Sequence, residues 1–378
     1  MSSPKTVATS AAMVAGGMYL LYKSTSTILT TVSKMQMNPF DDELGSVIRE
    51  KGAPSYDEIK ALGIIAGKSV LLVGGTRGVG YGTALAMAMS GASTVTIVGR
   101  SEASGSNAVS TIVGELDNES ESTVNFVRGD IGTVTSANEL IEKLQKCDTR
   151  YDYLIVTAAI FPHRKDPSPL NADGIEKSFG IGVVGRFLLF RKAHSFMKPP
   201  TEDPSHSPMI LNVLASGGKM GKRFDRRLVR SLHGFHMFNI ANFALGNEIT
   251  LHKLTTSGGE NSDGKPYAIP IVTTHPGTLK TDLHRGQGLW MDIAEAIAVH
   301  FMGISKEECG RREVSILCTV GEKRRKKKIS SLLTIVDNFG YGRLINNDME
   351  KDVQDHGDWL WDLLVLMEGG GSIDEYKD

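Results

Sequence analysis

The chain has 378 residues, of which 40% are hydrophobic and 22% are charged, and its formal net charge at pH 7 is −1. This composition is sufficient for a sizeable core and gives no overall attraction to nucleic acid. The cysteines, Cys147, Cys309 and Cys318, have neither paired nor metal-ligand spacing, so we expect neither a disulfide framework nor a metal site.

Residues 1–40 differ in composition from the rest of the chain. They contain three lysines and no acid, and the twelve residues from Ala11 to Tyr22 are apolar or small. A standard transmembrane helix needs about 20 apolar residues, a length that residues 7–32 reach only if Lys23 snorkels or lies against protein. Three interpretations stay open: a membrane anchor, an organelle targeting signal and an ordinary packed helix.

Strands and helices alternate regularly after a connector at residues 41–65. Buried strands are predicted at 68–73, 94–98, 124–127, 153–156, 209–214 and 268–273. Helices are predicted at 55–62, 80–90, 107–115, 136–146, 176–194 and 235–254. This alternation predicts an α/β fold, a doubly wound parallel sheet of the Rossmann type, with an N-terminal apolar helix and a C-terminal helical extension.

The C-terminal extension is strongly patterned in charge. A basic run covers Lys323 to Lys328, and the residues from Asp337 to the end contain eleven acids and three cations. A short apolar helix is predicted from Trp359 to Met367. We therefore divide the chain into an anchor or targeting segment (1–40), a connector (41–65), a dinucleotide-binding domain (66–320) and a basic run with an acidic helical tail (321–378).

A glycine-rich turn, Gly74-Gly-Thr-Arg-Gly-Val-Gly80, joins the first strand to the first helix. Glycine lets the chain bend through positive φ and lets a pyrophosphate approach the backbone, while the following helix offers its N–H groups. A tight turn without a ligand is the competing interpretation. The predicted contacts of this turn are Gly74, Thr76, Arg77, Gly78, Val79 and Gly80.

The ends of the second and third strands predict which nucleotide is bound. Gly99-Arg100 stands where an acid would hold the ribose hydroxyls of NAD, so Arg100 and Arg77 favour the 2′-phosphate of NADP(H). Both arginines could also be simply solvated. Asp130 and Ile131 follow the third strand at the expected place of the adenine, and a helix-start aspartate is the alternative interpretation.

These motifs together resemble the short-chain dehydrogenase/reductases over about residues 66–320. The resemblance rests on the glycine turn, on Gly129-Asp-Ile131 and on Pro276-Gly277 with Thr281 in the loop after the sixth strand. Asp173-Gly-x-Glu176 with Phe187-Leu-Leu189 resembles the branch related to retinol dehydrogenases. The family implies a nicotinamide along the C-terminal edge of the sheet, with Ala158, Pro276 and Gly277 among its contacts.

The chain departs from the family pattern where the chemistry is done. The family needs a tyrosine acid and a lysine four residues later on one helix face, assisted by a serine and an asparagine. Alignment places Phe235, Asn239, Ala215 and Gly182 at these four positions. No tyrosine lies between Tyr153 and Tyr267, and no lysine lies between Lys222 and Lys253, so a shifted register cannot restore the pair.

Three functional hypotheses follow. The leading one is an NADP(H)-binding accessory or structural subunit of a membrane complex, without the family's catalytic pair. The second is an active oxidoreductase on a lipophilic alcohol or carbonyl, with Ser216 and His236 as the weak catalytic candidates. The third is a regulator that senses NADP(H).

The terminal extensions lead us to expect protein partners in a membrane-associated complex. Membrane contact would be made by residues 7–32, and no nucleic acid is expected. The mitochondrial inner membrane is favoured, with the endoplasmic reticulum as the alternative. Six cations between Lys219 and Arg230 form a basic loop that could meet an anionic substrate, an acidic partner or lipid, or only water.

Overall fold

The computed structural model describes residues 52–117, 120–161, 166, 168–201, 207–214, 223–233, 236–256, 258–276, 304–327, 329–336 and 347–376. The side chains of residues 236, 237 and 347–349 are outside this description. The expectations for the segment 1–40, including its span at 7–32, therefore lie outside the described residues. So do Ser216 and Gly277.

Seven parallel strands form one sheet in the order β3-β2-β1-β4-β5-β6-β7. The strands are β1 (Ser69–Val73), β2 (Thr94–Gly99), β3 (Thr123–Arg128), β4 (Tyr153–Val156), β5 (Met209–Val213), β6 (Ile271–Thr274) and β7 (Leu333–Val336). The order reverses between β1 and β4, and ligands of such sheets bind outside the carboxyl ends of the strands at that reversal. The predicted doubly wound α/β fold is confirmed.

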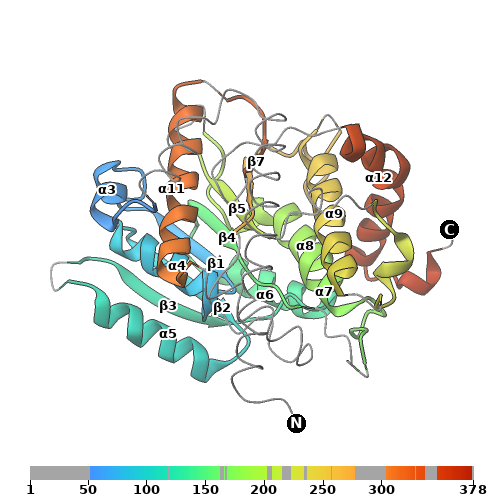
Figure 1. Cartoon of the computed structure of the whole chain (residues 1–378), viewed down its shortest axis with the longest axis horizontal. Coiled ribbons are helices and arrows are strands. Elements are labelled where there is room, and N and C mark those ends of the chain that lie inside the picture. The colour runs from blue at the N-terminus through green and yellow to red at the C-terminus, as the bar shows by residue number, and fades with distance from the viewer. Residues whose placement is uncertain are drawn as a thin grey trace, which may run out of the picture.

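Helices cover both faces of the sheet (Figure 1). They are α3 (Tyr56–Ala61), α4 (Gly78–Met89), α5 (Glu102–Glu115), α6 (Val134–Lys146), α7 (Lys177–Phe179), the π-helix η2 (Gly180–Val184), α8 (Gly185–Arg191), η3 (Ala193–Ser195), η5 (Arg226–Val229), α9 (His236–Thr255), α11 (Lys306–Arg325), α12 (Asn347–Glu368) and η7 (Ile373–Glu375). The helix predicted at 176–194 is thus one helical run that a π-turn interrupts.

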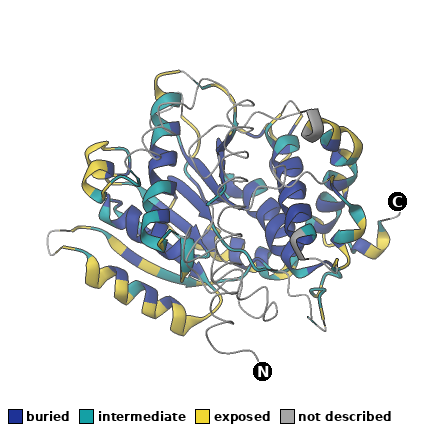
Figure 2. Ribbon diagram, in the orientation of Figure 1, coloured by how far each residue is buried: buried dark blue, intermediate teal, exposed yellow. Residues whose placement is uncertain are grey.

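Two apolar cores form because the central strands are buried on both faces. One core packs α6, α8, α9 and α12 against one face, and the other packs α3, α4, α5 and α11 against the opposite face. Figure 2 shows the central strands and the helices α8 and α9 as mostly buried, whereas the edge strand β3 and the outer side of α5 carry exposed residues. All five residues of β5 are buried, as expected for an inner strand of a parallel sheet.

The sequence patterns did not predict α11 and β7, which complete the sheet beyond β6. Helix α11 lies against α4 at Gly82 and Gly310, where the backbones approach so closely that a Cβ on Gly82 would lie 1.8 Å from the carbonyl oxygen of Lys306. The domain boundary expected at residue 320 falls inside α11, and β7 belongs to the same sheet. The helix predicted at Trp359–Met367 is the second half of the longer α12.

Candidate functional site

The glycine turn between β1 and α4 is a backbone cradle that side chains would fill. Gly74 has a φ of +99°, and a Cβ there would lie 2.5 Å from the backbone nitrogen of Ala158. Gly78 also has a positive φ, +57°. A Cβ on Gly80 would lie 2.2 Å from the carbonyl oxygen of Gly74. Only glycine fits these positions, so the turn presents bare backbone at the reversal of strand order.

The first turn of α4 faces this cradle without a capping side chain. Its N-cap residue, Arg77, is extended with φ −161° and makes no capping hydrogen bond, and the turn contains no acid. The N–H groups at the start of a helix carry partial positive charge and need acceptors. This arrangement fits the pyrophosphate of a dinucleotide, which would supply those acceptors.

Two arginines lie beside the cradle. Thr76 packs against the end of β2, because a Cβ on Gly99 would lie 2.6 Å from its methyl group. The contact brings Arg77 and Arg100 to the same edge, where both are exposed. The side chain of neither arginine forms a hydrogen bond or ion pair with any other described residue. Their guanidinium groups are available for an anion at this edge.

Asp130 and Ile131, the residues expected at the adenine, are engaged within the chain. One carboxylate oxygen of Asp130 accepts the N–H groups of Ile131 and Gly132, at 2.8 and 3.1 Å. The side chain of Ile131 is 1% exposed and belongs to the core beneath α8. Asp130 is not the N-cap of α6, a role taken by Thr133. An adenine contact from Ile131 would therefore come from its backbone or from a moved side chain.

The end of β4 joins the cradle to the middle of the sheet. The hydroxyl of Thr157 donates to the carbonyl oxygen of Gly74 at 3.2 Å, and the N–H of Ala158 donates to Val73 at 3.1 Å. The carbonyl oxygen of Ala158 accepts a hydrogen bond from the buried Arg186 at 2.9 Å. Pro276, after β6, is half-buried at the same edge of the sheet. Ala158 and Pro276 therefore lie where the remainder of a dinucleotide would pass.

Polar side chains on β5 and α9 are tied to one another under this edge. The amide nitrogen of Asn212 donates to Asn247 Oδ1 at 2.8 Å, and Asn247 Nδ2 donates to the carbonyl oxygen of Gly182 at 3.1 Å. A Cβ on Gly182 would lie 2.9 Å from the ring of Phe243. Gly182, the position aligned with the family's asparagine, therefore lets α9 pack closely against the π-helix η2. It offers no polar side chain.

The residue at the position aligned with the family's lysine, Asn239, is also hydrogen-bonded within the chain. Asn239 is 2% exposed, its Nδ2 donates to the carbonyl oxygen of Ser231 at 3.1 Å, and its Oδ1 accepts the N–H of His233 at 2.9 Å. His233 is exposed and its ring lies 4.5 Å from that of Phe238. The weak catalytic candidates, Ser216 and the side chain of His236, lie outside the described residues.

The basic loop predicted before α9 meets the acidic tail of the same chain. Arg223 forms ion pairs with Asp352 and, at 2.8 Å, with Asp355. Arg226 lies 4.8 Å over the ring of Trp359, and Arg230 pairs with Asp374. These described arginines therefore contact α12 and the residues after it, within the same chain.

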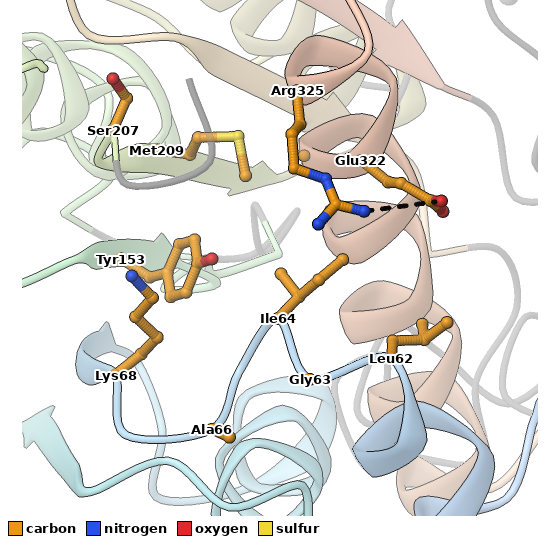
Figure 3. Close-up of a pocket in the computed structure, with 11 residues that line it drawn as sticks. Leu62, Gly63, Ile64, Ala66, Lys68, Tyr153, Ser207, Met209, Glu322 and Arg325 are labelled. Carbon is orange, nitrogen blue, oxygen red and sulfur yellow. Dashed lines mark ion pairs between the residues drawn. The ribbon is translucent and has the colours of Figure 1, made fainter. Parts of the chain in front are cut away.

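A cavity of about 330 Å³ opens at the opposite, N-terminal edge of the sheet (Figure 3). Tyr153 and Met209 line one side, and Ile64 and Arg325 line the other. Arg325 is paired with Glu322 at 3.9 Å, and the other lining cation, Lys68, is paired with Asp152 at 3.5 Å. Since the glycine cradle lies at the carboxyl ends of the strands, this cavity is separate from it.

Residues 68–225 match the family model for short chain dehydrogenases. The chain belongs to the short-chain dehydrogenase/reductase superfamily. This superfamily binds nicotinamide cofactors, and the bare cradle and the uncapped start of α4 fit such a group. The predicted family is confirmed. Within the described residues, no helix is long and apolar enough to cross a membrane.

Similar proteins span several activities. Polyprenol dehydrogenase of Homo sapiens is 30% identical over 145 residues, which are 38% of this chain and 41% of that protein. Retinol dehydrogenase 13 of Mus musculus is 25% identical over 60% of this chain and 62% of its own length. The chain thus spans less than two thirds of either relative. The solved MalC Reductase/Diels-Alderase of Malbranchea aurantiaca has a TM-score of 0.52 at 17% identity, covering 74% of this chain and 97% of that one, and shows the fold alone.

Buried Arg186 and its asparagine neighbours were missed by the sequence patterns. A signal was present, because Arg186 is a lone cation between Val183-Val-Gly185 and Phe187-Leu-Leu-Phe190. A cation inside an apolar helical run either snorkels or is buried against polar groups. The sequence could not show which groups would receive it, since they come from β4 and β5.

Proposed function

We propose that this superfamily member binds NADP(H) and does not perform the acid–base chemistry of a tyrosine–lysine pair. One observation carries the proposal. Asn239, at the position aligned with the lysine, is buried, and both its amide oxygen and its amide nitrogen form hydrogen bonds with the loop at 231–233. An amide carries no charge that could lower the pKa of a neighbouring acid. Phe235, at the tyrosine position, has no proton to donate.

The preference for NADP(H) over NAD(H) is supported by Arg77 and Arg100. Both are exposed at one edge of the sheet and neither is paired with another described residue. A 2′-phosphate would receive charge-assisted hydrogen bonds from them, each worth about 1.5–3 kcal/mol. NADH lacks that phosphate, so the two dinucleotides differ in affinity through this pair.

Binding and turnover measured side by side test the proposal. Titration of the full chain with NADPH and NADH is expected to show much tighter binding of NADPH. The double variant Arg77→Ala, Arg100→Ala is expected to lose roughly 100-fold in NADPH affinity and little in NADH affinity. NADPH oxidation with a panel of retinoid and steroid carbonyls is expected to be absent. Turnover that His236→Ala abolishes would overturn the non-catalytic part.

A second candidate, an active oxidoreductase on a lipophilic alcohol or carbonyl, is favoured by the names of the relatives. They include a polyprenol dehydrogenase and a retinol dehydrogenase. Ser216 would orient the carbonyl and His236 would supply the proton in that case. The same turnover assay separates the two candidates, because only this one predicts consumption of NADPH.

A role as an accessory subunit of a membrane complex, in the mitochondrial inner membrane, remains part of the leading proposal. Its support is the sequence of residues 1–40, with an apolar stretch and no acid. Native size after mild detergent extraction tests it. Co-migration with a large assembly is expected. Migration as a free monomer or dimer would contradict the accessory role and would not bear on the proposed nucleotide site.

A further inference from the structure

Arg186 places a complete guanidinium group under the carboxyl ends of the two central strands. Its side chain starts on α8 and is 0% exposed. Nη1 donates to the carbonyl oxygen of Val156 at 3.0 Å and to Asn212 Oδ1. Nη2 donates to the carbonyl oxygens of Ala158 and Val213, at 2.9 and 3.0 Å. The group therefore bridges β4 and β5.

The charge of Arg186 is not neutralised by any described acid. All of its hydrogen-bond acceptors are neutral carbonyl or amide oxygens, and its buried Nε has no partner. Buried charges in proteins are normally paired with opposite charges. Burial lowers the pKa of Arg186 to about 9, so the group is still a cation at neutral pH. The sheet edge thus retains a net positive charge inside the protein.

This charge lies close to the glycine cradle. Ala158, which accepts from Nη2, has its backbone nitrogen and Cα at 2.5 and 2.7 Å from the place of a Cβ on Gly74. Only one residue's backbone therefore separates the guanidinium from the turn. A dinucleotide that starts at the turn and runs along this edge toward Pro276 passes over the cation.

We propose that the buried guanidinium of Arg186 makes this site select the reduced dinucleotide, NADPH, over NADP⁺. The inference rests on the proposed function and deepens it. The two ligands share the same phosphates and adenosine, and they differ in the nicotinamide ring, which is neutral in NADPH and positively charged in NADP⁺. Two like charges in a water-poor interior repel each other, so the oxidised ligand is disfavoured.

The expected size follows from Coulomb's law. At a separation of about 10 Å and an effective dielectric constant of about 20, the repulsion corresponds to a preference of roughly tenfold for NADPH. A bracing role alone, in which Arg186 only joins β4 to β5, predicts no such preference. The two roles therefore differ in the ratio of the NADPH and NADP⁺ affinities. They do not differ in stability, because Arg186 stabilises the fold in both.

Calorimetric titration of the full chain with NADPH, NADP⁺ and 2′,5′-ADP tests the proposal. The last ligand lacks the nicotinamide and reports on the adenosine end of the site. Wild type is expected to bind NADPH roughly tenfold more tightly than NADP⁺. Arg186→Lys, which keeps the charge, should preserve the ratio, and Arg186→Gln should bring it close to one. The affinity for 2′,5′-ADP should be the same in all folded variants.

Arg150→Met, a substitution of an exposed arginine that precedes β4, is the matched control and should leave the ratio unchanged. A wild-type ratio near one would overturn the inference, and this measurement needs no variant to fold. A ratio that persists in folded Arg186→Gln would also overturn it. If wild type binds none of the three ligands, the proposed NADP(H) site falls and the inference falls with it. Normal 2′,5′-ADP binding without redox preference overturns only the inference.

Discussion

The β1–β3 half of the sheet and the β4–β6 half treat polar groups at their carboxyl ends in opposite ways. In the first half, glycines leave the backbone of the turn at 74–80 open, the start of α4 is uncapped, and the side chains of Arg77 and Arg100 have no described partner. In the second half Arg186, Asn212, Asn239 and Asn247 all bind other parts of the chain. The first half leaves backbone and cations accessible at its edge, whereas the second half bonds its polar side chains within the chain.

The difference separates backbone that is open to a ligand from side chains that are bonded within the chain. Gly74 and Gly80 leave the backbone of the turn open, because a Cβ on either would collide with neighbouring backbone. The buried asparagines of the second half bond to one another and to backbone, since an unsatisfied buried polar group is costly. The variants below test this contrast, from the largest expected effect to the smallest.

The largest effect is expected where the β1–β3 half relies on contact between backbones. Gly82→Ala would put a Cβ 1.8 Å from the carbonyl oxygen of Lys306 and force α11 away from α4. We expect the free energy of unfolding to fall by roughly 3 kcal/mol or more. Chemical denaturation measures it.

Gly114→Ala on α5 is the matched control, because a Cβ there would meet nothing within 4 Å. It should raise the free energy of unfolding by about 0.5–1 kcal/mol through helix propensity. Equal losses in the two variants would show that the crossing of α4 and α11 is not the reason for glycine.

Glu313 on α11 is a buried acid whose hydrogen-bond partner on the sheet is Thr274, at 2.5 Å. Burial raises the pKa of Glu313 to about 7 from an ordinary 4.5. The folded protein therefore binds a proton that the unfolded chain releases between these pH values. The free energy of unfolding should fall by about 2–3 kcal/mol as the pH rises from 4.5 through 7, and then level off.

Denaturation curves recorded across this pH range measure the effect. Glu313→Gln cannot titrate and should remove that part of the pH dependence. A variant that keeps the full wild-type slope would assign the pH dependence to other groups.

The attachment of the acidic tail to the β4–β6 half depends on Arg223. Its partner Asp352 is 1% exposed, so Arg223→Ala leaves a buried carboxylate with less compensation. Because Arg223 itself is partly exposed, we expect a loss of about 2 kcal/mol in the free energy of unfolding. Faster proteolysis of the tail should accompany it.

Arg227→Ala in the same loop is the control. The side chain of Arg227 is 87% exposed and pairs only with Asp225 among the described residues. Its removal should change stability by less than about 0.5 kcal/mol. Similar losses for Arg223 and Arg227 would mean that the tail is not held by the buried pair.

The smallest effect tests whether Asn239 is a structural replacement. Asn239→Ala removes both bonds to the loop at 231–233 and should cost about 1–2 kcal/mol. Asn239→Asp keeps the acceptor for the N–H of His233 but puts a buried carboxylate oxygen against the carbonyl oxygen of Ser231, so it should cost at least as much. If neither variant changes thermal unfolding, while NADPH affinity drops, Asn239 serves the ligand rather than the loop.

Local patterns were sufficient for much of the fold. The apolar runs that became β1 to β6 and the glycine turn before α4 were predicted within a few residues. The run at Leu333–Val336 is short and only half-buried at the sheet edge, so its pattern was too weak to predict β7. Helix α11 was missed because charged residues line much of it, and Cys309, Val314 and Leu317 become buried only when it packs against α4 and its other neighbours.

The sequence by itself determined the family, the glycine turn and the residue types at positions 235 and 239. Each of these depends on which residue type occupies one place in a local motif. Only the tertiary structure decided which groups the buried polar side chains bind. These contacts join residues that are far apart in the chain. They are the hydrogen bonds of Arg186 to β4 and β5, the hydrogen bond between Asn212 and Asn247, and the ion pairs between the basic loop and the acidic tail. Such partners are chosen by the packing of whole elements, which no local pattern encodes.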